Sequence, residues 1–329
     1  MLLEIKNLET SFFTDEGVAR AVHDVSFSIP RGKTVGVVGE SGCGKSVTAM
    51  SVMGLVAKPG RVTGGEILLH HQNGEVKDLL KLSEKQMRKV RGKQIAMIFQ
   101  EPMSSLNPVF RIGKQISEAI LLHQPGVTKA DAWKRAVEML DRVRIPEPHQ
   151  RAKEFPHQFS GGMRQRAMIA MALSCDPALL IADEPTTALD VTIQAQILDL
   201  LRELQQSTKM SIMIITHDLG VVSEMAEEVV VMYASEVVEK ADVTTIFTSP
   251  RHPYTQGLMR SRPELGNASE RKETLYTIPG SVPSPLMFPS GCKFHPRCKY
   301  CFEKCKKEAP VLREVTPGHF VRCWQDEEK

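Results

Sequence analysis

The residues best suited to chemistry form a glycine-rich segment directly after a short apolar run. Gly39-Glu40-Ser41-Gly42-Cys43-Gly44-Lys45-Ser46 has the spacing of a phosphate-binding loop, and a stretch of helical period follows from Val47 to Val56. The glycines permit a turn whose backbone N–H groups converge on phosphate oxygens at the start of a helix. Lys45 is placed to reach the β- and γ-phosphates, and the Ser46 hydroxyl to bind Mg²⁺. The segment predicts a site for a nucleoside triphosphate.

Two carboxylates follow the apolar run at 179–182. Asp183 suits the binding of Mg²⁺, and Glu184 can orient or deprotonate a water that attacks the γ-phosphate. Taken alone, this pattern also fits a strand end with solvated acids. In a chain that carries a phosphate-binding loop, it predicts the groups that hydrolyse the bound triphosphate.

A second anion-binding helix end is indicated by Ser160-Gly161-Gly162. Ser160 is a typical N-cap for a helix running through Met171, and the two glycines leave the first amides of that helix open. The helix after Ser46 already serves the phosphates of this chain. We therefore expect the second helix end to contact a nucleotide bound by another subunit.

The cysteines are concentrated near the end of the chain. Five of the seven lie between positions 292 and 323, namely Cys292, Cys298, Cys301, Cys305 and Cys323. In a reducing cytosol such a cluster indicates a metal site before it indicates disulfides. Cys298 and Cys301 form a C-x₂-C pair of zinc type, and four thiolates suit either zinc or an iron–sulfur cluster. Spacing alone leaves zinc, iron–sulfur and unliganded thiols open.

The elements that must position these residues alternate along the chain. Apolar, β-branched runs at 34–38, 95–99, 179–182, 211–216 and 229–232 are separated by longer stretches of helical period. This pattern predicts an α/β fold with a mostly parallel sheet covered by helices. Between about 104 and 156 only helical spacing remains, which indicates a helical insert. From about 250 onward, frequent prolines predict a small irregular appendage tied together by its cysteines.

Length and composition agree with this organisation. The 329 residues are 42% hydrophobic and 25% charged, so the chain can form two domains or one large α/β domain with an appendage. A net charge of +3, spread evenly, does not indicate a nucleic-acid partner. The N-terminus lacks the pattern of a signal peptide and no apolar run reaches membrane-spanning length, so we expect a cytosolic chain.

Taken together, the motifs resemble the ATP-binding subunits of ABC transporters over nearly the whole chain. Six of them follow the order of the family: 39–46 (Walker A), Phe99-Gln100-Glu101-Pro102 (Q-loop), 159–163 (signature), 179–184 (Walker B), Ala188-Leu189-Asp190 (D-loop) and Thr216-His217-Asp218 (switch histidine). In the signature motif, Phe159 and Met163 replace the commoner Leu and Gln. Phe12, with Phe13 as the alternative, lies where the family keeps an aromatic ring that stacks on adenine.

The resemblance implies a P-loop NTPase (RecA-like) ABC nucleotide-binding domain over 1–250, with a helical subdomain at about 104–156. It also implies ATP and Mg²⁺ as cofactors, with Asp183, Ser46 and Gln100 as the Mg²⁺ residues. Glu184 would activate water, His217 would support the γ-phosphate, and Gln100 would report its presence to the helical insert. The residues that would contact nucleotide are Phe12, Gly39, Glu40, Ser41, Gly42, Cys43, Gly44, Lys45, Ser46, Val47, Gln100, Ser160, Gly161, Gly162 and Asp190.

The tail is similar to that of one branch of the family. Residues 247–255 and 291–298 resemble the ATPases of dipeptide and oligopeptide importers, particularly the dipeptide-permease D subunit. The resemblance implies that the extension 251–329 holds a 4Fe-4S cluster through Cys292, Cys298, Cys305 and Cys323, with Zn²⁺ as the alternative metal and Cys301 as an extra cysteine.

The same resemblance implies the partners. We expect a second, related ABC ATPase in a heterodimer, with a homodimer as the alternative, two integral membrane permeases, and indirectly an extracytoplasmic peptide-binding protein. The expected location is the cytoplasmic face of the cell membrane. Nickel complexes or other small solutes are alternative cargo. The rival classes are a soluble ABC ATPase of translation or DNA repair, and an iron–sulfur redox protein, for which no flavin or nicotinamide motif is present.

Overall fold

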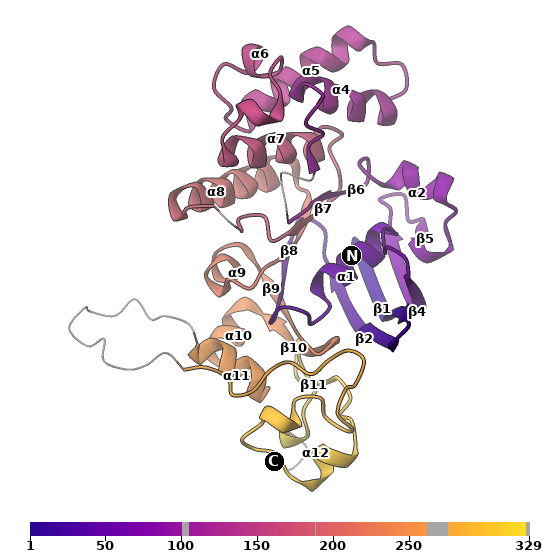
Figure 1. Ribbon diagram of the computed structural model, residues 1–329, viewed down its shortest axis with the longest axis vertical. Coiled ribbons are helices and arrows are strands. Elements are labelled where there is room, and N and C mark those ends of the chain that lie inside the picture. Colours follow the sequence, from indigo (N-terminus) through magenta and orange to yellow (C-terminus); the bar gives the residue numbers. More distant parts are fainter. Residues whose placement is uncertain (101–104, 188, 262–275, 327–329) are drawn as a thin grey trace, which may run out of the picture. The chain divides into compact units, whose positions relative to one another are not determined.

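The computed structural model describes residues 1–329 except 101–104, 188, 262–275 and 327–329 (Figure 1). The chain packs as two compact units. Unit 1 consists of Met1–Leu3, Ile29–Thr34 and Leu69–Ile215, and unit 2 of Glu4–Ser28, Val35–Leu68 and Thr216–Lys329. Each unit is therefore assembled from segments that are distant in the sequence.

Unit 1 contains three parallel strands. β6 (Ile95–Ile98) pairs with β7 (Leu179–Asp183), and β7 pairs with β8 (Ser211–Ile215), so that Leu179 lies between Ile95 and Ser211. Every residue of the three strands is buried. Continuous apolar runs are typical of parallel strands that are covered on both faces.

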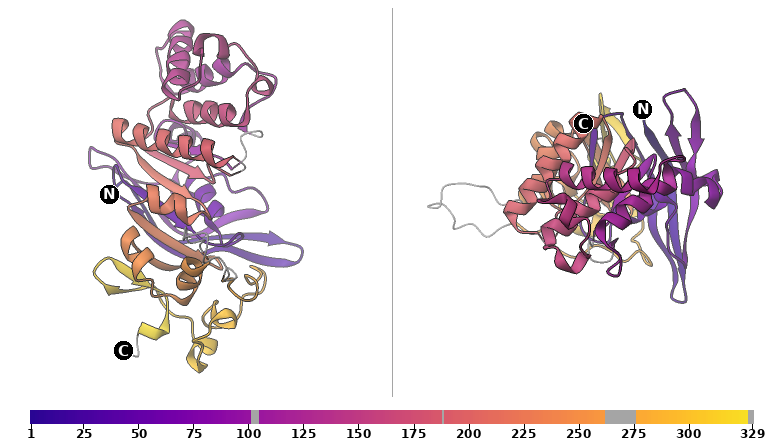
Figure 2. Two further views of the ribbon diagram at one scale, coloured as in Figure 1. Left: turned by 90° about the vertical axis from the view of Figure 1, so that its left-hand side faces the viewer. Right: turned by 90° about the horizontal axis from the view of Figure 1, so that it is seen from above.

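Helices make up most of the rest of unit 1. The helical insert forms a cluster of α4 (Ile112–His123), α5 (Lys129–Arg142) and α6 (Pro148–Arg151), which packs on α7 (Gly161–Leu173), as Figures 1 and 2 show. The buried residues of α5 recur at three- and four-residue spacing, as an amphipathic helix requires. The remaining elements are β5 (Val76–Asp78), α2 (Glu84–Val90), α8 (Val191–Thr208) and the 3₁₀ turns η1 (Leu79–Lys81) and η2 (Pro156–Gln158).

The strands of unit 2 form two groups of paired strands. In the first, the order is β2 (Gly17–Ile29), β1 (Leu3–Thr14) and β4 (Gly60–His70). In the second, β3 (Thr34–Val38) runs parallel to β9 (Glu228–Tyr233), and antiparallel pairing continues through β10 (Glu236–Asp242), β12 (His319–Val321) and β11 (Arg313–Thr316). The helices are α1 (Lys45–Met53), α9 (Leu219–Met225), α10 (Val243–Thr248), α11 (Pro253–Arg260), α12 (Glu303–Lys307), η3 (His295–Arg297) and η4 (Trp324–Asp326).

All five strands expected from the sequence are present, and the helical insert forms where it was predicted. The helix after the phosphate-binding loop ends at Met53, before the predicted end at Val56, because Gly54 adopts the left-handed conformation and ends α1. The tail is less irregular than expected, since β12 and β11 extend the same sheet as β3. The division into 1–250 and 251–329 stays a prediction. In the packing of the chain, the described residues beyond 250 belong to unit 2, together with Val35–Leu68.

Ion pairs attach the tail to earlier parts of unit 2. Lys293 lies 3.0 Å from Glu236, and Arg322 lies 2.8 Å from Asp24. Nε2 of His319 lies 2.7 Å from a carboxylate oxygen of Glu239, which is fully buried on β10. The Glu239 carboxylate also accepts the backbone N–H groups of Arg251 and His252, at 2.6 and 2.9 Å. One buried carboxylate therefore fixes both β12 and the start of α11.

We expect Glu239→Gln to lower the free energy of unfolding by about 2–4 kcal/mol, because an amide NH₂ group would then face buried N–H donors. Equilibrium urea unfolding of the full chain measures this. The matched control is Glu228→Gln, which removes a partly exposed ion pair with Lys240 at 3.4 Å. Its expected cost is below about 1 kcal/mol, and equal losses in the two variants would contradict the assignment.

The buried Glu239 carboxylate also predicts how the stability of the fold depends on pH. Burial raises the pKa of Glu239, but hydrogen bonds from His319 and from the backbone N–H groups of Arg251 and His252 bring its pKa below 4.5 overall. The stability contributed by the ionised carboxylate is then present above pH 4.5 and is lost as the pH falls through the lower folded-state pKa. Below pH 4.5, wild type should lose stability more steeply than Glu239→Gln.

Candidate functional site

The phosphate-binding loop joins buried strand β3 to α1 in unit 2. Gly39 has φ 150° and Gly44 has φ 98°, which only glycine adopts readily. A Cβ atom at Gly39 would overlap the carbonyl oxygen of Met232, and one at Gly44 would overlap that of Ala21. The loop is therefore pressed against neighbouring backbone, and both glycines are sterically required.

Lys45 closes the loop. Its side chain is buried, and Nζ donates hydrogen bonds to the carbonyl oxygens of Gly39 at 2.7 Å and Glu40 at 3.1 Å. Gly44 is the N-cap of α1 and has no side chain that could cap the helix. An anion can take the place of the missing cap, where the helix dipole favours negative charge.

Asp183 and Glu184 lie at the end of β7 in unit 1, and both are buried. Glu184 has φ 50°, which is uncommon for a residue other than glycine. Its backbone N–H donates to the carbonyl of Ile215 at 2.8 Å, and its carboxylate accepts the hydroxyl of Thr187 at 2.6 Å. Backbone and side chain are both held, as a group that orients a water requires.

Sequence reasoning missed two residues that support this strand end. Thr187 orients the carboxylate, and the sequence signal is a hydroxyl three residues after Glu184. Gln165, buried on α7, donates to the carbonyl of Pro185 at 2.5 Å. The signature helix is thereby tied to the acidic strand end within unit 1.

The signature segment forms the predicted helix end. Ser160 is the N-cap of α7 and accepts the N–H of Met163 at 3.3 Å. A Cβ atom at Gly161 would meet open space, whereas one at Gly162 would lie 2.9 Å from Ile193 on α8. Asp190 caps α8 by accepting the N–H of Ile193 at 3.0 Å. Asp190 thus has a structural task besides any contact with nucleotide.

The remaining nucleotide motifs lie at strand ends. Gln100 is exposed two residues after β6, while Glu101 and Pro102 of the Q-loop and Ala188 of the D-loop lie outside the described residues. In unit 2, His217 is exposed after Thr216, whose N–H donates to the carbonyl of Val37 on β3 at 3.3 Å. His217 is thereby brought to the same end of β3 as the phosphate-binding loop.

Two neighbouring rings stand at the position expected for adenine stacking. Phe12 is partly buried, and a Cβ atom at Gly60 would come within 2.6 Å of its ring. Phe13 is exposed, with the guanidinium of Arg61 4.2 Å above its ring centre. The stacking role of Phe12 stays a prediction, with Phe13 as its alternative.

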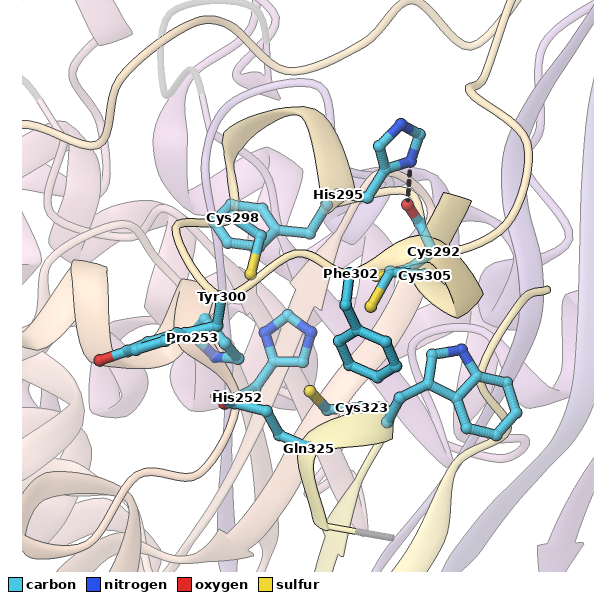
Figure 3. A pocket seen from close by; sticks show the side chains of 12 residues that line it. His252, Pro253, Cys292, His295, Cys298, Tyr300, Phe302, Cys305, Cys323 and Gln325 are labelled. Atoms are coloured by element: carbon cyan, nitrogen blue, oxygen red, sulfur yellow. Dashed lines mark hydrogen bonds between the residues drawn. The ribbon is translucent and has the colours of Figure 1, made fainter. Parts of the chain in front are cut away.

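The tail contains a pocket lined by the four predicted thiols, Cys292, Cys298, Cys305 and Cys323 (Figure 3). Burial, together with the neighbouring thiols Cys323, Cys305 and Cys298, raises the pKa of Cys292 to about 12. Cys301 does not line the pocket. In the described part of the chain, no three His, Cys, Asp or Glu side chains are arranged to hold a metal ion.

Comparison with known proteins identifies the family. The family pattern described as "ABC transporter" matches residues 22–187. A putative peptide import ATP-binding protein of Brucella melitensis is 53% identical over 331 aligned positions, which cover 99% of this chain and 98% of the relative. The chain belongs to the ABC transporter family. Its ATP-binding cassette is an ATPase, as the motifs predicted.

Further similarities extend along the chain. The pattern "Oligopeptide/dipeptide transporter, C-terminal region" matches residues 238–305. The dipeptide transport ATP-binding protein DppD of Escherichia coli is 48% identical, covering 98% of this chain and 96% of the relative. A dimeric ATP-binding cassette solved in a post-hydrolysis state with ADP and phosphate aligns with a TM-score of 0.65 at 27% identity, covering 74% of this chain and 99% of that one. The expected α/β cassette fold is confirmed.

No helix in the described residues is long and apolar enough to cross a membrane.

Glu184→Gln keeps the size of the side chain but removes the charge that activates water. We expect ATP to bind normally while hydrolysis falls at least about 100-fold. A phosphate-release assay on the assembled ATPase measures this. Asp199→Asn, which changes an exposed carboxylate on α8, is the control and should keep normal turnover. Hydrolysis by Glu184→Gln within about threefold of wild type would contradict the role of Glu184.

Proposed function

We propose that this chain is the ATP-hydrolysing subunit of an importer for dipeptides or oligopeptides, coupling hydrolysis to uptake through partner permeases. The observation that carries the proposal is the match of residues 238–305 to the C-terminal region of oligopeptide and dipeptide transporters. Relatives named for peptide and dipeptide import align over at least 98% of the chain and support it.

The mechanism follows from the residues at the strand and helix ends. Lys45 and the loop amides bind the β- and γ-phosphates, and Glu184 takes up the proton of the attacking water. Ser46, Asp183 and Gln100 would hold Mg²⁺, which neutralises phosphate charge when bound. His217 would donate to the γ-phosphate. In this proposal Phe12 stacks on adenine.

The chain provides two half-sites. Its phosphate-binding loop forms one, and Ser160, Gly161, Gly162 and Asp190 form the wall of a site on a second subunit. A related dimeric cassette supports this arrangement. We propose a heterodimer with a second related ATPase, a homodimer being the alternative, together with two membrane permeases and an extracytoplasmic peptide-binding protein. The chain would lie at the cytoplasmic face of the membrane.

A 4Fe-4S cluster is proposed for the thiol pocket, and its donor set fits. Cys292, Cys298, Cys305 and Cys323 line one pocket. Four Cys thiolates are the ligand set of a 4Fe-4S cluster, and they also suit Zn²⁺, which is the alternative metal. The role of the cluster here would be structural, joining a proline-rich segment that lacks a core of its own.

Reconstitution tests the transport function. The chain is co-expressed with its candidate permeases and second ATPase, and the complex is placed in proteoliposomes with ATP at the ATPase face. We expect uptake of dipeptides or oligopeptides that requires ATP and is lost in Glu184→Gln. Uptake of nickel complexes but not of peptides would contradict peptides as the transported solute and would favour nickel complexes instead. Full ATPase activity with no permease in the purified complex would contradict transport.

The metal proposal has its own test. Anaerobically purified chain should be brown, absorb at about 400 nm and contain about four iron and about four sulfide per chain. Serine at Cys292, Cys298, Cys305 or Cys323 should abolish these signals, while Cys301→Ser, whose thiol lies outside the pocket lining, should keep them. Stoichiometric zinc without sulfide would refute the cluster.

A further inference from the structure

Glu40, the second residue of the phosphate-binding loop, is held by two residues from beyond position 250. Its carboxylate accepts two hydrogen bonds from Arg297, Nη1 to Oε2 at 2.7 Å and Nη2 to Oε1 at 3.0 Å. Its backbone N–H donates to Oη of Tyr254 at 2.8 Å. A bidentate guanidinium–carboxylate pair fixes orientation as well as distance. Together with Tyr254, it restrains Glu40 at both its side chain and its backbone.

Arg297 cannot move away from this contact without breaking others. Its side chain is only 4% exposed, and Nε donates to the carbonyl of Pro279 at 2.8 Å. The guanidinium lies 5.7 Å from the ring centre of Tyr233 and 5.9 Å from that of Phe294. Contacts of this kind hold a cation over aromatic rings.

Tyr254 is equally fixed. It is fully buried, and its ring centre lies 4.6 Å from that of Tyr233 and 5.6 Å from that of Phe294. Burial raises its pKa, so the phenol stays neutral. Its oxygen accepts the N–H of Glu40, which places that peptide plane at the entrance of the loop.

The positive charge of Arg297 also changes the electrostatics of the phosphate-binding loop. Glu40 is the one acidic residue in the loop sequence 39–46, which has to receive a polyanion. An unpaired carboxylate there would repel phosphates, since like charges at short range raise the free energy of binding. Arg297 neutralises it, and Lys45, which contacts the carbonyl oxygens of Gly39 and Glu40, keeps its charge for the nucleotide.

We propose that Arg297 and Tyr254 are positioning residues of the nucleotide site, so that the C-terminal extension shapes the phosphate-binding loop and tunes its affinity for ATP. The proposal rests on nucleotide binding by this loop and is independent of which solute is transported. It is also independent of whether the thiol pocket holds a metal cluster.

The test measures the Kd for MgATP of the full-length subunit by calorimetry, alongside urea unfolding. Arg297→Gln should raise Kd about tenfold or more, because Glu40 is left unpaired beside the phosphates. Arg297→Lys keeps the positive charge but loses the bidentate guanidinium contact with Glu40, so it should give an intermediate Kd. Tyr254→Phe keeps the ring and should raise Kd about threefold to tenfold through loss of the acceptor alone.

Arg322→Gln is the matched control, because Arg322 is also buried and also pairs with a carboxylate, that of Asp24 at 2.8 Å. It should lower stability but leave Kd within about twofold of wild type. Adding Glu40→Gln to Arg297→Gln should bring Kd back to within about threefold of wild type, since the amide carries no charge.

Three results would each overturn the proposal: a Kd for Arg297→Gln within about twofold of wild type, an equal rise in Kd for Arg322→Gln, or no recovery when Glu40→Gln is added. The first would show that the pair does not act on the nucleotide. The second would show a general loss of stability. The third would show that the Glu40 carboxylate is not what opposes binding.

Discussion

A phosphate-binding loop works only while a flexible, glycine-rich backbone keeps several N–H groups directed at one anion. In this chain the order is imposed from outside the loop. Carbonyl groups of Met232 and Ala21 leave no room for side chains at Gly39 and Gly44, and Lys45 ties the carbonyl oxygens of the first loop residues together. The strands and helices of unit 2 matter for function because they supply these restraints.

The C-terminal tail belongs to the same system of restraints. It is held by strand pairing of β12 with β10, by ion pairs to Glu236 and Asp24, and by the hydrogen bond between His319 and Glu239. The segment between Cys292 and Cys298 both lines the thiol pocket and carries Phe294 and Arg297, which reach Tyr254 and Glu40. The tail thus connects a candidate metal site to the nucleotide loop through one short segment.

The parts of the site that the sequence predicts best are those set by local chemistry. The loop at 39–46, the carboxylates at the end of β7 and the Ser160 cap each follow from residue types at fixed spacing, and the buried strands follow from continuous apolar runs. Pairing between distant segments was not predictable. The hydrogen bonds to Glu239 and the Arg297–Glu40 ion pair join residues that lie 12 to 257 positions apart. The strands β11 and β12 are too short to give a recognisable sequence pattern. The strands β1, β2 and β4 were also missed, because their residues do not form continuous apolar runs.

The central claim is that ATP bound to the loop of one subunit is completed by the signature helix of another, and Gly161→Asp tests it most directly. A side chain at Gly161 meets open space, and a carboxylate at the start of α7 suits the helix dipole, so folding should be unaffected. The account predicts an unchanged Kd for ATP on the isolated subunit and loss of ATP-driven association of the ATPase subunits, measured by light scattering with Glu184→Gln as the background. Loss of ATP binding by the isolated subunit, or association as strong as without the substitution, would contradict it.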